Sequence, residues 1–540
     1  MWSSAGSFSF EKLWLRIGRW GALALTLMII SIAHVKIGGL LIEQTNFTDK
    51  DILGADQKHN MKMARLTRDD LSPDFSVGVS EPIKALFPHR TDGVVNPLWP
   101  WIAAWLLDDE IDPTGETEVT DKDREFFNRG RWFHVGWTLA VVIVLGFACM
   151  RVFSLGGTVV VMLLTGFGAL LPRAAYFQPE PIYFVFFAAT WVACMFALQK
   201  NSLWMHALVG GFGGIAYLAK GSVQPLLMAY VFVSTMRWLW GWVEARRSLA
   251  PWFFRYATAT RAALEQGDMP DNPDLQKLAS KTSNTQWLRR NHWLGLIIMA
   301  FCFFMTTGPR LSYSWKTFGD PFHSFPGYWM WFDDFKDCYA WMGEHNSREK
   351  LEATPKSERP SFSNYAKTHT GEQMWTRLVD GTKAKVGELL WPGYTTKSKK
   401  NPKPWKGVLE LRGLYLGWLA LVLGGITLAL RFAAPRPANA AQRVHPETVT
   451  HVCFVLCVVV GYSLAYGWYT PFGRGDRFML SLYAPLVLCL VWAGESLMRR
   501  ARRRKASKGV FIAWHTSQWL LVAAVAWRLI EIWRFPFFRN

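Results

Sequence analysis

The chain has 540 residues, of which 51% are hydrophobic and 19% charged, and its mean hydropathy is +0.08. This composition excludes a disordered or fibrous protein. Seven cysteines are too few for a disulfide scaffold of this length, and no Cys-x-x-Cys motif or Cys/His cluster offers a metal cage. The formal net charge of +19 would indicate a nucleic-acid partner in a soluble protein, but repeated apolar runs favour a membrane protein instead.

Apolar runs long enough to cross a bilayer recur through the chain. They cover residues 21–42, 132–150, 179–198, 226–243, 292–308, 411–431, 449–469, 478–497 and 512–531. Two shorter runs, 156–171 and 204–219, are predicted to span the membrane by packing on their neighbours. We therefore expect an all-α polytopic membrane protein with about 11 transmembrane helices. The first run lacks a small-residue cleavage site, so it is expected to be retained as a helix.

Basic residues beside the spans predict the orientation, because Lys and Arg close to a span resist translocation. Two connections and the N-terminal segment are strongly basic, and we place all three in the cytoplasm. Their basic residues are Arg246, Arg247, Arg255, Arg261, Arg289 and Arg290, then Arg499, Arg500, Arg502, Arg503, Arg504 and Lys505, and finally Lys12, Arg16 and Arg19. Two large loops, 43–131 and 309–410, then lie on the exoplasmic side.

The two predicted exoplasmic loops differ in character. Loop 43–131 is acidic, and its residues 97–107 are apolar, rich in Trp and too short to cross, so we expect them in the membrane interface. Residues 345–408 are polar and Lys-rich without a sustained apolar period. We expect a partly irregular surface excursion there.

The first candidate constellation is Asp56-Gln57 followed by Ala64-Arg65, shortly after the first span. A carboxylate just outside the bilayer can take a proton from an acceptor hydroxyl while a lipid-borne donor arrives from the side. The alternative is that Asp56 is one more solvated acid in an acidic loop.

The second constellation contains Asn96 and Trp99, which lie among prolines in the run from Asn96 to Trp101. These residues could shape the rim of a lipid-accessible groove. The alternative is an interfacial anchor without a ligand.

The third constellation is a predicted exoplasmic hairpin, 171–181, which carries Arg173 and Glu180 between three prolines. The guanidinium could bind phosphate, and the carboxylate could order an acceptor. The alternative is a solvated turn whose arginine anchors to lipid headgroups.

Three further cations lie at predicted exoplasmic ends of spans. Lys220 follows the glycine-rich run 204–219, and Arg474 and Arg477 precede the run 478–497. Positive charge on the exoplasmic side opposes the usual preference of Lys and Arg for the cytoplasmic side, and an anionic ligand would account for it. A guanidinium can bind a phosphate through two parallel hydrogen bonds. The alternatives are snorkelling of Lys220, and structural ion pairs in which Arg477 contacts Asp476 or Arg474 contacts another acid.

Cations and carboxylates thus converge on one predicted membrane face, from the ends of separate helices. This is the electrostatic requirement of a site for a lipid-linked phosphate, where cations stabilise the leaving group and a carboxylate activates the nucleophile. The sequence carries no P-loop, GxSxG or HExxH motif that would indicate nucleotide hydrolysis, serine acylation or zinc chemistry.

The order of these motifs resembles the GT-C superfamily of integral-membrane glycosyltransferases, in particular the branch of protein O-mannosyltransferases and aminoarabinose lipid A transferases. The resemblance covers about residues 15–500 discontinuously. Asp56-Gln57 with Ala64-Arg65 resembles the acidic motif of that branch, and the run Asn96–Trp101 is similar to its "PPLYPW" rim motif. The run Gly213–Gly221 resembles its "GLALLTKG" helix. Phe318-Gly319-Asp320-Pro321-Phe322 is similar to its "FGDPF" stretch, and Asp476-Arg477-Phe478 resembles its late "RY/RF" motif.

The resemblance implies a GT-C fold with two large exoplasmic loops, in which 1–308 is the catalytic transmembrane module, 309–410 the second exoplasmic loop and 411–540 the C-terminal transmembrane helices. It implies Asp56 as the catalytic carboxylate, with Glu180 as our hypothesis for a second one. The expected phosphate contacts are Arg173, Lys220, Arg477 and Arg474, and the expected acceptor or rim residues are Gln57, Asn96, Trp99 and Asp320. Asn96 replaces one proline of the family's rim pair, which leaves the acceptor open.

The expected activity is transfer of a sugar from a polyprenyl-phosphate donor to a lipid, glycan or protein acceptor, without nucleic acid. No soluble cofactor is implied. A divalent metal stays open, with Asp49, Asp51 and Asp56 as the ligands to consider. The alternatives are a related glycan polymerase or ligase, a lipid or glycan transporter and a non-catalytic scaffold; transport would favour internal repeats, which the sequence does not show. We expect a bacterial inner membrane, with the active site on the periplasmic face.

Overall fold

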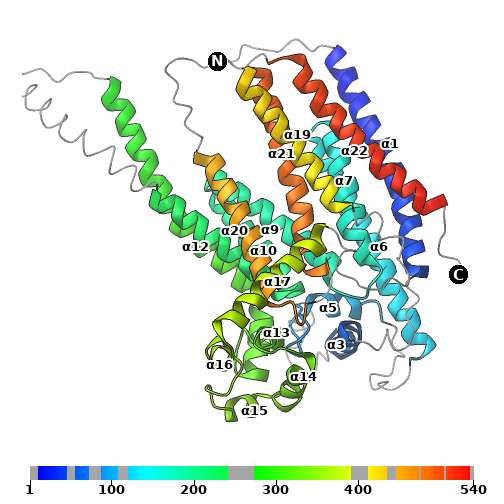
Figure 1. Ribbon diagram of the computed structural model, residues 1–540, viewed down its shortest axis with the longest axis vertical. Coiled ribbons are helices and arrows are strands. Elements are labelled where there is room, and N and C mark those ends of the chain that lie inside the picture. Colours follow the sequence, from blue (N-terminus) through cyan, green and yellow to red (C-terminus); the bar gives the residue numbers. More distant parts are fainter. Residues whose placement is uncertain are drawn as a thin grey trace, which may run out of the picture. The chain divides into compact units, whose positions relative to one another are not determined.

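The computed structural model describes residues 10–44, 55–71, 87–107, 119–240, 273–390, 411–433, 446–473, 476–503 and 506–534. Within these ranges the protein consists of helices and connecting turns, with no β-strand (Figure 1). The all-α class predicted from the sequence is therefore confirmed for the described part of the chain.

In these ranges nine helices are long and apolar enough to cross a membrane. They cover Ile17–Glu43, Asp121–Met150, Leu155–Ala174, Glu180–Lys200, His292–Phe318, Arg412–Arg431, Thr448–Trp468, Leu480–Arg503 and Lys508–Arg534. The protein is an integral multi-pass membrane protein. The predicted short run 156–171 belongs to a full-length span, whereas 204–219 forms the shorter apolar helix Leu203–Ala219. Residues 224–240 are also helical, but the total of about 11 spans stays a prediction.

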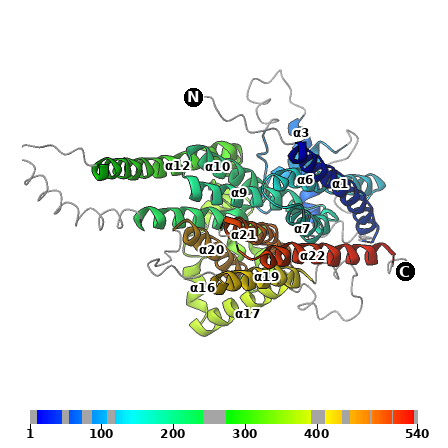
Figure 2. The same cartoon turned by 90° about the horizontal axis from the view of Figure 1, so that it is seen from above.

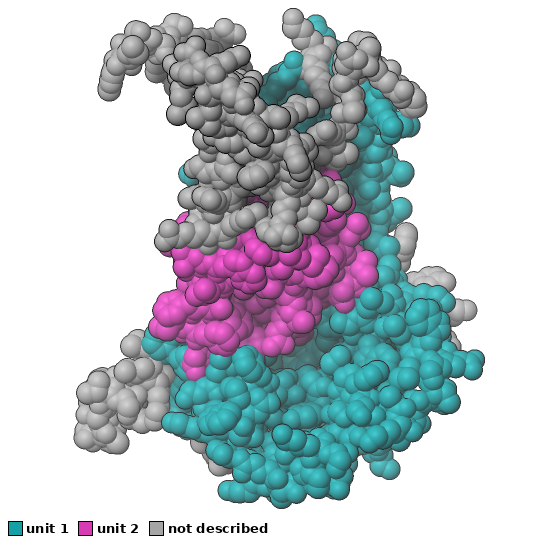
Figure 3. All heavy atoms as spheres, turned by 90° about the vertical axis from the view of Figure 1, so that its left-hand side faces the viewer, with its two compact units in different colours: residues 1–188, 309–440, 463–540 teal, residues 189–308, 441–462 magenta. Residues whose placement is uncertain are grey.

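The described chain divides into two compact units (Figure 3). Unit 1 contains Met1–Ala188, Pro309–Ala440 and Ser463–Asn540, and unit 2 contains Ala189–Gly308 and Ala441–Tyr462. The chain passes from unit 2 to unit 1 at Pro309, and the predicted division into three parts stays a prediction. Unit 1 nevertheless joins segments that the sequence-based division assigns to all three predicted parts.

In unit 1, helix α7 (Leu155–Thr165) is buried along nearly its whole length. It packs against α6 (Asp121–Met150), α21 (Tyr483–Arg503) and α22 (Lys508–Arg534), as Figure 2 shows from above. Helix α1 (Phe10–Gln44) lies against α6, and α19 (Arg412–Ala433) against α21 and α22.

A π-helical turn, η2 (Gly166–Leu170), connects α7 to the short helix α8 (Leu171–Ala174). The carbonyl of Gly168 accepts a hydrogen bond of 2.9 Å from Nε of Arg412, which is fully buried. The Arg412 guanidinium therefore supplies a hydrogen-bond donor to a backbone carbonyl of this turn. A buried carbonyl without a donor would be costly inside a membrane. The turn leads directly into the predicted hairpin motif that carries Arg173.

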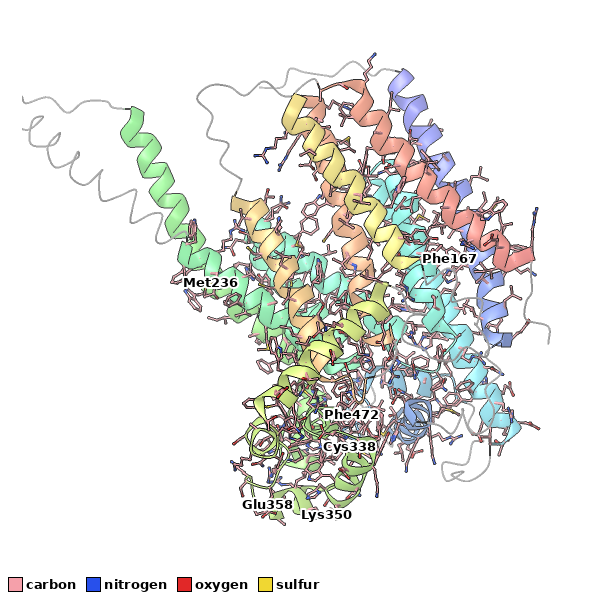
Figure 4. The ribbon with its side chains drawn as sticks, viewed as in Figure 1. Phe167, Met236, Cys338, Lys350, Glu358 and Phe472 are labelled. Atoms are coloured by element: carbon pink, nitrogen blue, oxygen red, sulfur yellow. The ribbon has the colours of Figure 1, made fainter. Side chains whose placement is uncertain are left out.

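The remaining helices of unit 1 gather at one end of its long helices, the lower end in Figure 1. They are α3 (Ala55–Leu71), α5 (Leu98–Ala104), α13 (Phe325–Trp329), α14 (Phe335–Glu344), α15 (Arg348–Ala353), α16 (Phe362–Thr368) and α17 (Gly371–Leu390). A separate small core holds part of this region together, and Figure 4 labels two of its members, Cys338 and Phe472. The whole cluster comprises Phe318, Phe325, Trp329, Cys338, Leu351 and Phe472.

In the predicted partly irregular excursion 345–408, the helices α15, α16 and α17 occupy most of the described part, and residues 354–361 and 369–370 between them are not helical. Residues 391–408 of that stretch lie outside the described residues. Ser347 and Ser361 cap the first two of these helices by accepting backbone N–H groups of Lys350 and Asn364.

In unit 2, the glycine-rich helix α10 (Leu203–Ala219) packs closely against α12 (Pro273–Phe318). A Cβ atom on Gly210 would lie 2.1 Å from the carbonyl oxygen of Met299, and one on Gly214 would lie 2.7 Å from Cβ of Thr306. The glycines therefore serve close helix packing. The first part of α20 (Pro446–Trp468) and the second part of α9 (Glu180–Lys200) also belong to this unit.

Candidate functional site

Asp56 lies in the first turn of α3, where its carboxylate contacts the guanidinium of Arg477. Arg477 belongs to the 3₁₀ turn η4 (Asp476–Phe478), directly before α21. The Asp56 side chain is 38% exposed and the Arg477 side chain 22% exposed, so both can be reached from solvent. Two residues that the sequence singled out separately thus form one ion pair.

Two carboxylates act on Arg477. Burial alone would lower the pKa of Arg477, but the carboxylates of Asp56 and Glu180 and the phenol of Tyr469 raise it above its ordinary value. Glu180, in the first turn of α9, is only 2% exposed. Its charge therefore acts on the same guanidinium that contacts Asp56.

Two tyrosines complete the surroundings of the ion pair. Burial and the Asp56 carboxylate raise the pKa of both Tyr339 and Tyr469, while Arg477 acts in the opposite direction. Tyr339 lies on α14 and is 40% exposed, and Tyr469 follows the end of α20. Aromatic side chains from two separate elements thus lie within electrostatic reach of the pair, and neither carries a motif that would single it out in the sequence.

A second polar pair lies one turn along α3. Nδ1 of His59 is 2.9 Å from Oδ2 of Asp92. The hydrogen bond to Asp92 raises the pKa of His59, burial opposes it, and the charges of Asp92 and Asp56 raise it further. Oδ1 of Asp92 accepts the backbone N–H groups of Val94 and Val95, at 2.9 and 2.8 Å, so its carboxylate is held in place.

Gln57 is 6% exposed, and its Oε1 accepts the backbone N–H of Phe177 at 3.1 Å. Gln57 therefore fastens the predicted hairpin 171–181 to α3. Farther along α3, Arg65 contacts Asp123, the residue that completes the capping box of α6 with Thr120. Both contacts are structural and fix the helix that presents Asp56, while the predicted acceptor role of Gln57 stays a prediction.

Trp99 is fully buried, and its predicted role at a rim stays a prediction. Its ring centroid lies 4.0 Å from that of His134 and 4.9 Å from that of Phe177. Five of the seven residues of α5 are buried, so this part of the predicted interfacial segment packs inside the protein. Asn96 is half-buried, and its role at a rim stays a prediction.

The other predicted cations lie in different environments. Arg173 is half-buried, with its guanidinium carbon 5.5 Å from the ring centroid of Tyr176. Lys220 follows α10 in unit 2 and adopts an extended backbone. Arg474 lies outside the described residues. Arg477 is the predicted cation for which the structure places a carboxylate, that of Asp56, in direct contact.

Asp320 lies in the turn between α12 and α13, where its Oδ1 accepts the backbone N–H of Phe322 at 2.9 Å. Beside it, burial lowers the pKa of His323 to about 4, so this histidine is neutral at pH 7. Arg310 donates to the carbonyls of Pro321 and His323, at 2.7 and 2.9 Å. These contacts order the turn, and the rim role of Asp320 stays a prediction.

No group of three or more His, Cys, Asp or Glu side chains in the described part of the chain could hold a metal ion. Asp49 and Asp51 lie outside that part, and Asp56 contacts Arg477. The described residues therefore offer no metal centre from which a reaction step could be derived.

No protein-family model and no curated protein matches the chain.

Proposed function

We propose that the protein is a glycosyltransferase of the GT-C type, which moves a sugar from a polyprenyl-phosphate donor to an acceptor on the exoplasmic membrane face. The observation that carries the proposal is the contact between Asp56 and Arg477. The first is the predicted base and the second a predicted phosphate contact. A base and a phosphate-binding cation belong to one site in such an enzyme, since they face the anomeric carbon from opposite sides, and the two groups must separate when the donor sugar enters between them.

We propose that the reaction inverts the configuration of the anomeric carbon. The acceptor hydroxyl gives its proton to the Asp56 carboxylate, and its oxygen attacks the anomeric carbon of the sugar. The bond between that carbon and the phosphate oxygen breaks, and its electron pair leaves with the polyprenyl phosphate. Arg477 stabilises the charge that the phosphate gains. The products are the glycosylated acceptor and polyprenyl phosphate, and the proton remains on Asp56 until water removes it.

The ion pair also supports an order of events. In the free protein Arg477 is engaged by Asp56, so an arriving phosphate must compete for the guanidinium. Once the phosphate takes the guanidinium, Asp56 is released to accept a proton. Binding of the donor would thus prepare the base, and the free protein would keep the base occupied.

The proposed side of the membrane rests on charge. Within unit 1, Arg477 precedes α21, whereas Arg500, Arg502 and Arg503 lie in the last turn of that helix. A dense basic helix end favours the cytoplasm. The opposite end, which carries the Asp56–Arg477 pair, is then exoplasmic. A periplasmic site in a bacterial inner membrane fits this orientation.

The test is consumption of labelled polyprenyl-phosphate sugars by membranes that contain the wild type, the Asp56→Asn variant or the Asp69→Asn variant. Asp69 is an exposed acid on the same helix and serves as the matched control. We expect wild type and Asp69→Asn to consume one donor of the panel and Asp56→Asn to lose at least about a hundredfold in rate. Equal consumption by Asp56→Asn would remove Asp56 as the base, and no consumption by any form would favour a transporter.

A further inference from the structure

Helix α17 presents one face to the segment that carries Arg477. Arg377, Gly381 and Lys385 are spaced four residues apart and therefore share one side of the helix. Each of the three contacts the stretch 463–473, which leads from the end of α20 toward η4. All of these residues belong to unit 1.

The first contact holds the end of α20. Nε of Arg377 donates to the carbonyl of Trp468 at 3.0 Å, and its guanidinium carbon lies 4.8 Å from the Trp468 ring centroid. The same guanidinium donates to the carbonyl of Met330 and to Asp333, at 3.1 and 3.0 Å. Arg377 thus joins the end of α20 to the turn before α14.

The second contact is a close backbone crossing. A Cβ atom on Gly381 would lie 2.0 Å from the carbonyl oxygen of Gly467. A Cβ atom on Gly467 would in turn lie 2.7 Å from the backbone nitrogen of Thr382. The two backbones can approach this closely only because both positions are glycine.

The third contact comes closest to the ion pair. Lys385 is fully buried, and its Nζ donates to Oε2 of Glu388 at 2.6 Å and to the carbonyl of Gly473. Nζ also lies 5.5 Å from the ring centroid of Phe478, and the guanidinium carbon of Arg477 lies 4.9 Å from the same centroid. A buried ammonium is costly unless its N–H groups find acceptors. Lys385 therefore holds the Gly473 carbonyl and the Glu388 carboxylate close to its Nζ atom.

From this arrangement we infer that Lys385 is a positioning residue for Arg477. It fixes the carbonyl of Gly473 and the ring of Phe478, and through them the place where the guanidinium meets its anionic partner. The inference rests on the proposed function only for the identity of that ligand, the phosphate of a polyprenyl carrier. It gives the second predicted exoplasmic loop, through α17, an indirect part in donor binding, exerted through Arg477.

The test compares two variants that both remove the buried charges. Lys385→Met/Glu388→Leu fills the site with apolar groups, which often preserves folding when both members of a buried pair are replaced. Lys385→Gln/Glu388→Gln also removes both charges but keeps an N–H donor for the Gly473 carbonyl. Lys383→Met is the control, since Lys383 is 74% exposed on the same helix and pairs with the exposed Asp380.

Two readouts are used on the full-length protein in detergent: hydrogen exchange of backbone amides in residues 469–482, and binding of unglycosylated polyprenyl phosphate. We expect the Met/Leu variant to exchange about tenfold faster in that segment and to bind about tenfold more weakly. The Gln/Gln variant and Lys383→Met should resemble the wild type in both readouts. A merely structural role would change thermal stability without changing affinity.

Several outcomes would overturn the inference. One is a folded Met/Leu variant whose amides in residues 469–482 exchange at the wild-type rate. Another is a Met/Leu variant whose amides exchange faster while its affinity for polyprenyl phosphate is unchanged. Faster exchange in the Gln/Gln variant would also contradict the role of the N–H donor, and that variant keeps the test informative if the Met/Leu variant does not fold. If the wild type binds no polyprenyl phosphate, the proposed function fails, whereas the exchange rates still decide whether Lys385 positions the segment.

Discussion

The guanidinium of Arg477 contacts the carboxylate of Asp56 across 421 residues of sequence. Asp56 lies in the first turn of α3 and Arg477 precedes α21, so the ion pair connects an early loop to a late span within unit 1. Glu180 adds a second negative charge to the field at Arg477. This arrangement is what a site needs if it binds an anion and also moves a proton, and the predictions below start from it.

Replacement of Arg477 tests the contact with the donor phosphate. Arg477→Ala should lower kcat/KM for the donor by about tenfold to a hundredfold, because a charged hydrogen-bonding partner is lost. Arg477→Lys should recover only part of this loss, since Lys keeps the charge but not the forked geometry. Initial rates at several donor concentrations measure the effect, and Arg348→Lys, at an exposed arginine, is the control. Full activity of Arg477→Ala would contradict the assignment.

Replacement of Glu180 tests the second carboxylate. Glu180→Gln keeps the shape of this buried side chain and removes its charge, so we expect transfer to slow by about a hundredfold if the carboxylate handles the acceptor proton or orders the acceptor. Binding of polyprenyl phosphate should not weaken, because the field at Arg477 becomes more positive. Glu125→Gln, at an exposed acid, is the control. Unchanged transfer by Glu180→Gln would remove Glu180 from the catalytic residues.

The pair of His59 and Asp92 predicts a pH-dependent contribution to stability. The pKa of His59 is raised in the folded protein above the ordinary value of 6.5. Its contribution is therefore fully present below pH 6.5 and is lost as the pH rises through the folded-state pKa. The difference in Tm between wild type and His59→Gln should shrink as the pH increases from 5 to about 9. A difference that stays constant over this range would contradict the prediction.

Two glycines of α17 offer a matched pair for the packing of this helix. Gly381→Ala places a methyl group against the backbone of Gly467 and should destabilise the protein by about 1–3 kcal/mol. Gly387→Ala meets no atom within 4 Å and should stabilise the helix by about 0.5–1 kcal/mol. Thermal or denaturant unfolding of both variants measures the effects. Equal stabilities would show that α17 does not lie against the end of α20 as described.

Much of the transmembrane architecture could be predicted, because a long apolar run has few stable alternatives to a spanning helix. Helix α17 was missed for an equally physical reason. Its packing face consists of Arg377, Gly381 and Lys385, whose hydrogen bonds and close backbone contacts produce no apolar period. Hydropathy cannot detect a helix that is held by such contacts.

The candidate site was predictable only in part. Asp56 and Arg477 stood out because a carboxylate and a cation at predicted exoplasmic helix ends call for a ligand, but their mutual contact required the fold. A Trp-rich segment with prolines is typical of a membrane interface, but the sequence could not show that the Trp99 ring packs against His134 and Phe177. Tyr339 and Tyr469 lie in no recognisable sequence motif. Only the fold brings them within electrostatic reach of the Asp56–Arg477 pair.

The most direct test of the account is the affinity for unglycosylated polyprenyl phosphate in the wild type, Asp56→Asn and Arg477→Ala. The account predicts effects of opposite sign. Asp56→Asn should bind about five- to tenfold more tightly, because Arg477 is released from its partner and a repelling charge is gone, although transfer slows at least about a hundredfold. Arg477→Ala should bind at least about tenfold more weakly. Equal weakening by both variants, or no change in either, would mean that the pair is a structural ion pair and not the donor site.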